Sequence, residues 1–171
     1  MNTCTFDSIN ELEKIKKYHP KCQCILKISS EQDDKFGVRM GEVREMLVKA
    51  KMLGLKVVGF SFNVGDCNVG GASFEAYKKC LEDIKKCLQI GNEVGIGEEL
   101  ELIDIGDGFS MLGDPHSENT FIDVAPKISD LVDKLFPDPR TRIISSPGKY
   151  ICESVAYSCA PIIGSKIMKD G

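Results

Sequence analysis

The sequence predicts an α/β fold in which about five parallel strands alternate with helices as a partial, TIM-type (β/α) barrel. Short apolar strands and amphipathic helices follow one another with short connections, which is the pattern of a parallel sheet. Unusual polar residues follow several strands at their ends, where a barrel gathers its site, whereas a doubly wound sheet concentrates such residues at one switch point. A complete barrel needs about 250 residues and eight strands. The chain has 171 residues, so we expect only part of one.

The predicted strands are short runs of apolar residues bounded by turn signals. The third is almost continuously apolar, as expected of a strand covered on both faces, and a turn-rich stretch follows it at 65–71. A further apolar segment lies at 160–168, just before the last three residues. In chain order, the strands are expected at 4–6, 22–28, 57–64, 100–105 and 143–144.

The predicted helices occupy the intervals between these strands and carry apolar residues at helical spacing. Ser8 and Glu11 form a capping-box pattern at the start of the first helix, and Pro20 ends it. Pro126 implies that the first half of the last helix is irregular. The helices are expected over about 8–18, 43–53, 73–91 and 120–135.

Composition and charge narrow the classes of function. The net charge is −4, and the basic residues are scattered, so the chain offers no basic surface for nucleic acid or anionic lipid. No run of about 18 apolar residues is present, and the N-terminus lacks the basic and apolar regions of a signal peptide. We therefore expect a cytoplasmic protein with neither a nucleic-acid nor a membrane partner.

The eight cysteines fall mainly inside predicted elements and lack the spacing of a disulfide scaffold, so we interpret them as reduced. Cys22 and Cys24 lie on one side of a strand, and a metal site with Cys67 is conceivable. Zinc sites normally show Cys-x-x-Cys pairs or nearby histidines, and the only histidines are His19 and His116. The favoured interpretation is small core residues without a metal.

Residues 103–109 form a glycine turn directly after a predicted strand. Gly106 and Gly108 would let backbone N–H groups converge on an anion such as phosphate, because they carry no Cβ. Asp107 lies between them and places a negative charge where the anion would bind. Two unit charges about 4 Å apart repel by roughly 4 kcal/mol at an effective dielectric near 20. The turn therefore has the form of a phosphate site but opposes its chemistry.

Motifs distributed over nearly the whole chain resemble the ornithine decarboxylase family of pyridoxal-phosphate decarboxylases. These motifs lie at Thr5–Ser8, His19–Pro20, Lys35–Gly37, Ser61–Gly65, Leu102–Phe109, Phe136–Pro137 and Arg142–Tyr150. The resemblance implies a barrel of the alanine racemase kind followed by a separate C-terminal β domain. Residues 1–171 would then be a single partial barrel domain, with 150–171 leading towards that β domain.

The same resemblance implies a degenerate cofactor site. Asn63 stands where the family has a histidine against the pyridine ring, and Asp66 stands near its phosphate-binding serine. Asp107 replaces the central glycine of the family's Gly-Gly-Gly-Phe, with Gly106 and Gly108 retained. The family's Glu-Pro-Gly-Arg presents a glutamate to the pyridine nitrogen and an arginine to the phosphate, and the corresponding residues here are Ser146, Pro147, Gly148 and Lys149.

These departures predict a regulatory homologue of polyamine metabolism in which pyridoxal phosphate is lost or weakly bound. It would act like an antizyme inhibitor, with antizyme as partner, or as a pseudo-subunit of a catalytic homologue. No catalytic residue is expected, since the family's Schiff-base lysine and catalytic cysteine lie in other regions. The two edges of a half barrel favour a homo-oligomer or a hetero-oligomer. Alternatively, the chain is a segment of an active decarboxylase, or its cluster of Asp66, Asp104 and Asp107 binds a cation.

Overall fold

The computed structural model describes residues 3–30, 35–64, 72–110 and 119–152, together with Val155, Cys159 and Pro161. Strands and helices alternate along these residues, and two short 3-10 helices, η1 and η2, join them. In chain order the elements are β1 (Thr3–Phe6), α1 (Ile9–Tyr18), β2 (Gln23–Lys27), η1 (Met40–Glu42), α2 (Val43–Met52), β3 (Lys56–Ser61), α3 (Phe74–Val94), η2 (Gly97–Glu99), β4 (Leu102–Asp104), α4 (Phe121–Leu135), β5 (Arg142–Ile144) and α5 (Gly148–Cys152).

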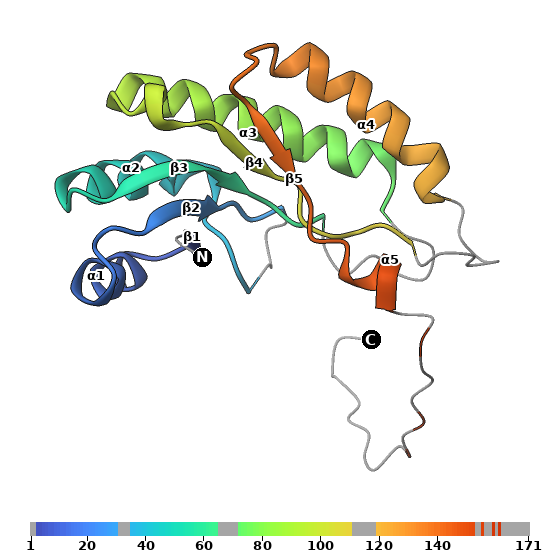
Figure 1. Ribbon diagram of the computed structural model, residues 1–171, viewed down its shortest axis with the longest axis horizontal. Helices are drawn as coiled ribbons and strands as arrows, with labels where there is room; N and C mark the ends of the chain where they lie inside the picture. Colours follow the sequence, from blue (N-terminus) through green and yellow to red (C-terminus); the bar gives the residue numbers. More distant parts are fainter. Residues whose placement is uncertain are drawn as a thin grey trace, which may run out of the picture.

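The five strands form one parallel sheet in the order β1-β2-β3-β4-β5. Each strand therefore pairs with its neighbour in the sequence, as in a barrel, and the order does not reverse as it does in a doubly wound sheet. Figure 1 shows the strands as a curved row with the long helices packed along it. This arrangement confirms the predicted partial (β/α) barrel, and β1 and β5 are the outermost strands among the residues that the structure describes.

The main hydrophobic core lies between the sheet and the helices. Leu12 of α1, Leu47 of α2 and Leu81 of α3 are completely buried in it. The opposite face of the sheet carries a separate small cluster of Ile25, Val58 and Leu102. A strand buried on both faces reads as continuously apolar, which explains the apolar run predicted for β3.

Helix α1 begins as its sequence predicts. Ser8 has an extended backbone, and its hydroxyl accepts a hydrogen bond from the Glu11 N–H at 3.3 Å, which satisfies one of the unpaired donors of the first turn. The helix ends at Tyr18, two residues before Pro20.

No helix in the described part of the chain combines the length and the apolar character needed to cross a membrane.

Helix α3 extends beyond its predicted end at Gly91. Gly91 is buried inside the helix, and a Cβ there would lie 2.3 Å from Leu100 Cδ1. The missing side chain thus makes room for Leu100 and does not mark a helix end. The helix ends at Val94, and the next residue, Gly95, has a φ of 77°, the left-handed conformation that glycine adopts just after helix ends. Strands β2, β3 and β4 are also shorter than predicted.

The sequence predicts an irregular first half of α4 because of Pro126. This prediction is wrong, since the helix is continuous from Phe121 to Leu135. Proline cannot donate a hydrogen bond to the carbonyl four residues earlier, which is that of Ile122. This carbonyl lies in the first turn, at a residue that is 80% exposed, where water can satisfy it.

Several predicted features lie outside the described residues. They include the turn at 65–71 with Asp66 and Cys67, most of the apolar segment at 160–168, and His116.

The buried Cys87 thiol of α3 gives the fold a specific sensitivity to alkaline pH. Burial, followed by the negative charge of Asp83, raises the pKa of Cys87 from 9.0 to about 12. The folded protein therefore keeps a proton that the unfolded chain releases above about pH 9, so stability falls as pH rises through this window. Between pH 9 and 10.5, we expect the unfolding free energy to fall by about 2 kcal/mol more in the wild type than in Cys87→Ala. Urea unfolding at both pH values measures this difference, and equal slopes for the two proteins would contradict it.

Candidate functional site

The carboxyl ends of β3, β4 and β5 bring most of the predicted site residues together. Because these strands are parallel neighbours, the segments that follow them leave the same edge of the sheet. The Phe62 N–H donates to the Asp104 carbonyl at 3.1 Å, and the Ile105 N–H donates to the Ile144 carbonyl at 2.9 Å. Asn63, the glycine turn and the segment from Ser146 to Lys149 are thus adjacent, whereas Asp66 lies outside the described residues.

Gly106 is held between the ends of β3 and β5. Its φ is +65°, and a Cβ would lie only 2.3 Å from the Phe62 carbonyl oxygen. On the other side, its carbonyl accepts hydrogen bonds from the Ser145 hydroxyl at 2.8 Å and the Ser146 N–H at 3.0 Å. Only glycine combines this backbone conformation with so close an approach.

Gly108 is under a similar restriction on the side of α3. Its φ is +126°, and a Cβ would lie 2.2 Å from Val64 Cγ2 and 2.9 Å from the Tyr77 hydroxyl oxygen. The Tyr77 hydroxyl also donates a hydrogen bond to the Asp107 carbonyl at 3.3 Å. The turn therefore has little freedom to change shape around its central residue.

The Asp107 carboxylate occupies the centre of the turn. Oδ1 accepts a hydrogen bond from the Gly108 N–H at 2.8 Å, and Oδ2 accepts one from the Lys149 N–H at 3.1 Å. Backbone N–H groups that converge in this way form an anion-binding concavity. Here an oxygen of the chain itself accepts from each of these two donors, one in the turn and one after β5.

Asp104 has a structural role at the end of β4. One carboxylate oxygen accepts from the Gly106 N–H at 3.0 Å, and the other accepts from the Ser61 hydroxyl at 3.0 Å. Such bonds tie the turn to the two strands. Both described carboxylates of the predicted cation cluster, those of Asp104 and Asp107, therefore accept hydrogen bonds from the protein.

Asn63 follows the carboxyl end of β3, next to the glycine turn. Its Oδ1 atom is buried and has no hydrogen-bond partner among the described residues. Buried polar atoms nearly always have a partner. The described residues do not provide one, and the neighbouring residues 65–71 lie outside that part of the chain.

A row of four aromatic rings in contact with one another includes Phe109, the residue that follows Gly108 of the turn. Phe109 stacks on Tyr77 at 5.3 Å between ring centroids and meets Phe121 of α4 edge-on at 5.2 Å. Phe121 in turn contacts Tyr150 of α5 at 5.0 Å. Sequence periodicity assigned Tyr77 only to the core face of a helix and gave no signal for Ser145, because the contacts of both residues with the turn are tertiary.

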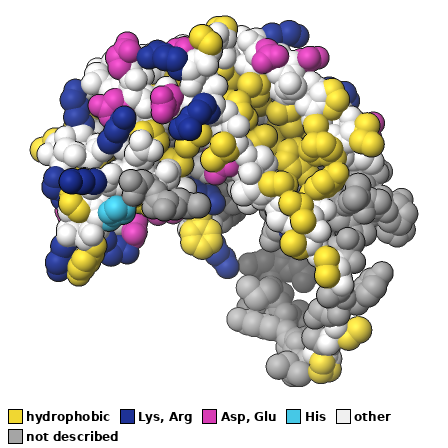
Figure 2. All heavy atoms as spheres, viewed as in Figure 1, with side chains coloured by type: hydrophobic (Ala, Val, Ile, Leu, Met, Phe, Trp, Pro, Cys, Tyr) yellow, Lys and Arg dark blue, Asp and Glu magenta, His cyan; other side chains and the backbone are white. Residues whose placement is uncertain are grey.

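An apolar groove lies beside the turn, between α4, β5 and α5. Its volume is about 580 Å³, and Phe109, Phe121, Ile143, Pro147 and Ile151 are among its lining residues. Pro147 thus lines the groove next to the glycine turn that contains Asp107. Figure 2 shows hydrophobic side chains gathered over this part of the molecule. Two of the lining side chains, Phe121 and Ile151, are 38% and 65% exposed.

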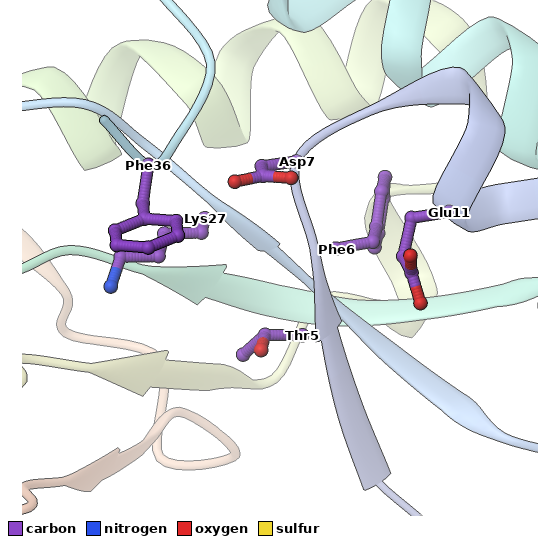
Figure 3. Close-up of a pocket in the computed structure, with 6 residues that line it drawn as sticks. All are labelled: Thr5, Phe6, Asp7, Glu11, Lys27 and Phe36. Carbon is purple, nitrogen blue, oxygen red and sulfur yellow. The ribbon is translucent and has the colours of Figure 1, made fainter. Parts of the chain in front are cut away.

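A second, more polar pocket of about 350 Å³ lies at the carboxyl ends of β1 and β2. Figure 3 shows the Phe36 ring beside the Lys27 side chain, with Asp7 at the end of β1. Lys27 Nζ is 5.9 Å from the centroid of the Phe36 ring, and Asp7 Oδ2 accepts from the Gly37 N–H at 3.0 Å. Two of the motifs on which the family resemblance depends, Thr5–Ser8 and Lys35–Gly37, therefore meet at this pocket.

A parallel partial barrel with a glycine turn at the carboxyl ends of its strands has the arrangement of the phosphate-binding type of (β/α) domain. Residues 1–153 match the family model of the pyridoxal-dependent decarboxylase, pyridoxal binding domain. The chain belongs to this family, as the motifs had indicated.

Individual relatives support the same conclusion. The chain is 34% identical to ornithine decarboxylase 2 of Drosophila melanogaster over 162 residues, which is 90% of this chain and 39% of that protein. It superimposes on arginine decarboxylase of Paramecium bursaria Chlorella virus with a TM-score of 0.72 and 31% identity, covering 87% of this chain and 39% of the viral chain. For ornithine decarboxylase of Entamoeba histolytica, the TM-score is 0.67, the identity 31%, and the coverage 85% and 38%. The chain thus spans less than half the length of these relatives.

Proposed function

We propose that this chain is a non-catalytic regulatory homologue of ornithine decarboxylase in which the pyridoxal-phosphate site is degraded. The observation that carries the proposal is the Asp107 carboxylate, which accepts the N–H groups of Gly108 and Lys149 inside the glycine turn. In the family, the corresponding glycine turn holds the phosphate of the cofactor.

The phosphate of pyridoxal phosphate fits this arrangement poorly. It would have to displace a carboxylate that already accepts two backbone hydrogen bonds, and it would meet a like charge at close range. A repulsion of roughly 4 kcal/mol corresponds to about a thousandfold weaker binding.

The residues after β5 weaken the site further. Lys149 replaces an arginine and cannot provide the planar fork that holds phosphate with two parallel bonds. Ser146 replaces the glutamate that faces the pyridine nitrogen, and a neutral hydroxyl does not stabilise a pyridinium as a carboxylate does. Asn63 replaces the family's histidine and has no ring that could stack on the cofactor. Each of these substitutions acts against the cofactor at the same site.

We further propose that the chain acts through a partner. The edge strands β1 and β5 and the apolar groove beside α4 are surfaces suited to association. The partner would be a second copy of this chain, a catalytic ornithine decarboxylase homologue that it joins as a pseudo-subunit, or antizyme, which it would sequester in the manner of an antizyme inhibitor. A cytoplasmic location would suit each of these roles.

Reconstituted decarboxylase assays test the proposal. We expect no release of carbon dioxide from ornithine by this chain with pyridoxal phosphate. We also expect that the chain restores the activity of an ornithine decarboxylase inhibited by antizyme or, if it is a pseudo-subunit, changes the activity of that enzyme directly. Carbon dioxide release by the chain alone would refute its non-catalytic nature, and no effect in either mixture would refute the regulatory role.

Light scattering and a matched pair of surface variants locate the interaction. Ile151→Asp places a charge in the apolar groove, whereas Met52→Asp places one on α2, at a residue that is 79% exposed and lies outside the groove. Only the first variant should abolish the complex and its effect on activity. Equal loss with both variants would exclude the groove as the interface.

The alternative function is a segment of an active decarboxylase whose catalytic lysine and cysteine lie outside this chain. It is favoured by the fact that the chain covers 39% of the Drosophila relative. Determining the coding sequence on either side decides between the two, since an upstream lysine motif in the same reading frame would support the segment. An active segment would still have to bind cofactor beside Asp107.

A further inference from the structure

Three cysteine thiols meet at the amino ends of β1 and β2, at the opposite end of the sheet from the glycine turn. Cys4 and Cys24 are direct partners in the strand register, and Cys22 immediately precedes β2. Cys22 and Cys24 belong to the core on the helix-covered face of the sheet, and Cys4 packs against that core. The tertiary structure thus adds Cys4 to a pair that the sequence places on one side of a strand.

The spacing of the three sulfur atoms suits a metal ion. All three Sγ atoms lie within 4.8 Å of one another, and those of Cys4 and Cys22 are 2.9 Å apart. Bonds of about 2.3 Å from zinc to sulfur imply sulfur atoms about 3.8 Å apart in a tetrahedral site. The upper limit of 4.8 Å is compatible with that value, whereas Cys4 and Cys22 would have to move apart from 2.9 Å to bind one ion.

The surroundings of the sulfurs favour a soft cation over other ligands. Cys22 and Cys24 are 1% and 0% exposed. Cys22 also donates to the Gln23 carbonyl at 3.4 Å, and Cys24 donates to the Cys22 carbonyl at 3.7 Å. Thiolates select zinc and copper(I) among the common metal ions. Within the described residues, this is the only group of three or more potential ligands so close together.

We propose that Cys4, Cys22 and Cys24 form a binding site for a thiophilic metal ion, Zn²⁺ or Cu⁺. Cys4 is the only partly exposed member, so the ion would enter on its side, where a water molecule can complete a zinc site. The thiols that coordinate the ion release their protons to solvent, and no electron is transferred. The ion would join the edge strand β1 to β2. This site departs from the expectation that the cysteines serve only as core residues.

Metal binding to the 171-residue chain tests the proposal. After incubation with Zn²⁺ or, under reducing conditions, with Cu⁺, and removal of excess metal, mass spectrometry of the native protein should show one ion per chain. Co²⁺ should give the near-ultraviolet charge-transfer absorption of thiolate ligation. Either Zn²⁺ or Cu⁺ in one-to-one ratio supports the site and identifies its ion, whereas retention of neither overturns it.

Variants separate this site from adventitious binding. Cys4→Ser changes the partly exposed ligand and Cys24→Ala a buried one, and each should weaken metal binding at least a hundredfold. Cys80→Ala removes a buried thiol outside the cluster and should bind as the wild type does. Circular dichroism checks that the variants fold, and Cys4→Ser keeps the test decisive if Cys24→Ala does not. Unchanged binding by Cys4→Ser would overturn the proposal, as would a Cys4–Cys22 disulfide that persists under reducing conditions in place of bound metal.

Discussion

Replacing Asp107 by glycine is expected to convert the self-occupied turn into a working phosphate site. The substitution removes the carboxylate that accepts the N–H groups of Gly108 and Lys149 and leaves those donors directed at the vacated space. Removal of a repulsion of roughly 4 kcal/mol should increase affinity for pyridoxal phosphate and inorganic phosphate about a thousandfold. Calorimetric titration of the wild type and the variant with both ligands measures the change.

The companion variant Asp107→Asn separates charge from shape. An asparagine oxygen can still accept one of the two hydrogen bonds, so the space stays filled while the negative charge is lost. We expect affinity for phosphate between that of the wild type and that of Asp107→Gly. If Asp107→Gly folds, as judged by circular dichroism, but binds phosphate no better than the wild type, the carboxylate is not what keeps the anion out.

Replacing Gly106 by alanine is expected to cost about 2 to 5 kcal/mol of unfolding free energy. The left-handed backbone disfavours a Cβ by about 1–2 kcal/mol. In addition, the new Cβ would lie 2.3 Å from the Phe62 carbonyl oxygen, and overpacking of this kind costs about 1–3 kcal/mol. A loss of this size is a large fraction of the stability of a typical domain, about 5–15 kcal/mol. Urea unfolding followed by circular dichroism measures it.

Gly41→Ala is the matched control, because a Cβ at Gly41 would meet no atom within 4 Å. Its unfolding free energy should change by no more than about 0.5 kcal/mol. A similar loss of unfolding free energy in both variants would show that the loss in Gly106→Ala does not come from the close packing of Gly106 between β3 and β5.

The order and approximate extent of the elements were predictable because they depend on local patterns. Ser8 caps α1 as predicted, and five strands alternate with helices. The differences arose where a tertiary contact overrides a local signal. Gly91 resembled a helix end but makes room for Leu100, and Pro126 is accommodated in the exposed first turns of α4.

Much of the candidate site was also predictable, because parallel neighbouring strands end at one edge of a sheet. Asn63, the turn around Asp107 and the segment at Ser146–Lys149 meet there. Tyr77 and Ser145 were missed, since their hydrogen bonds to the turn depend on how α3 and β5 are placed.

The sequence alone therefore determined the family, the half-barrel order of elements and the presence of a carboxylate between two glycines, because each is encoded by neighbouring residues. Only the tertiary structure decided what that carboxylate contacts. Asp107 accepts the N–H of Lys149, which is 42 residues away, and Cys4 joins Cys22 across 18 residues. Such contacts depend on strand order and register, which bring distant segments of the chain within hydrogen-bonding distance.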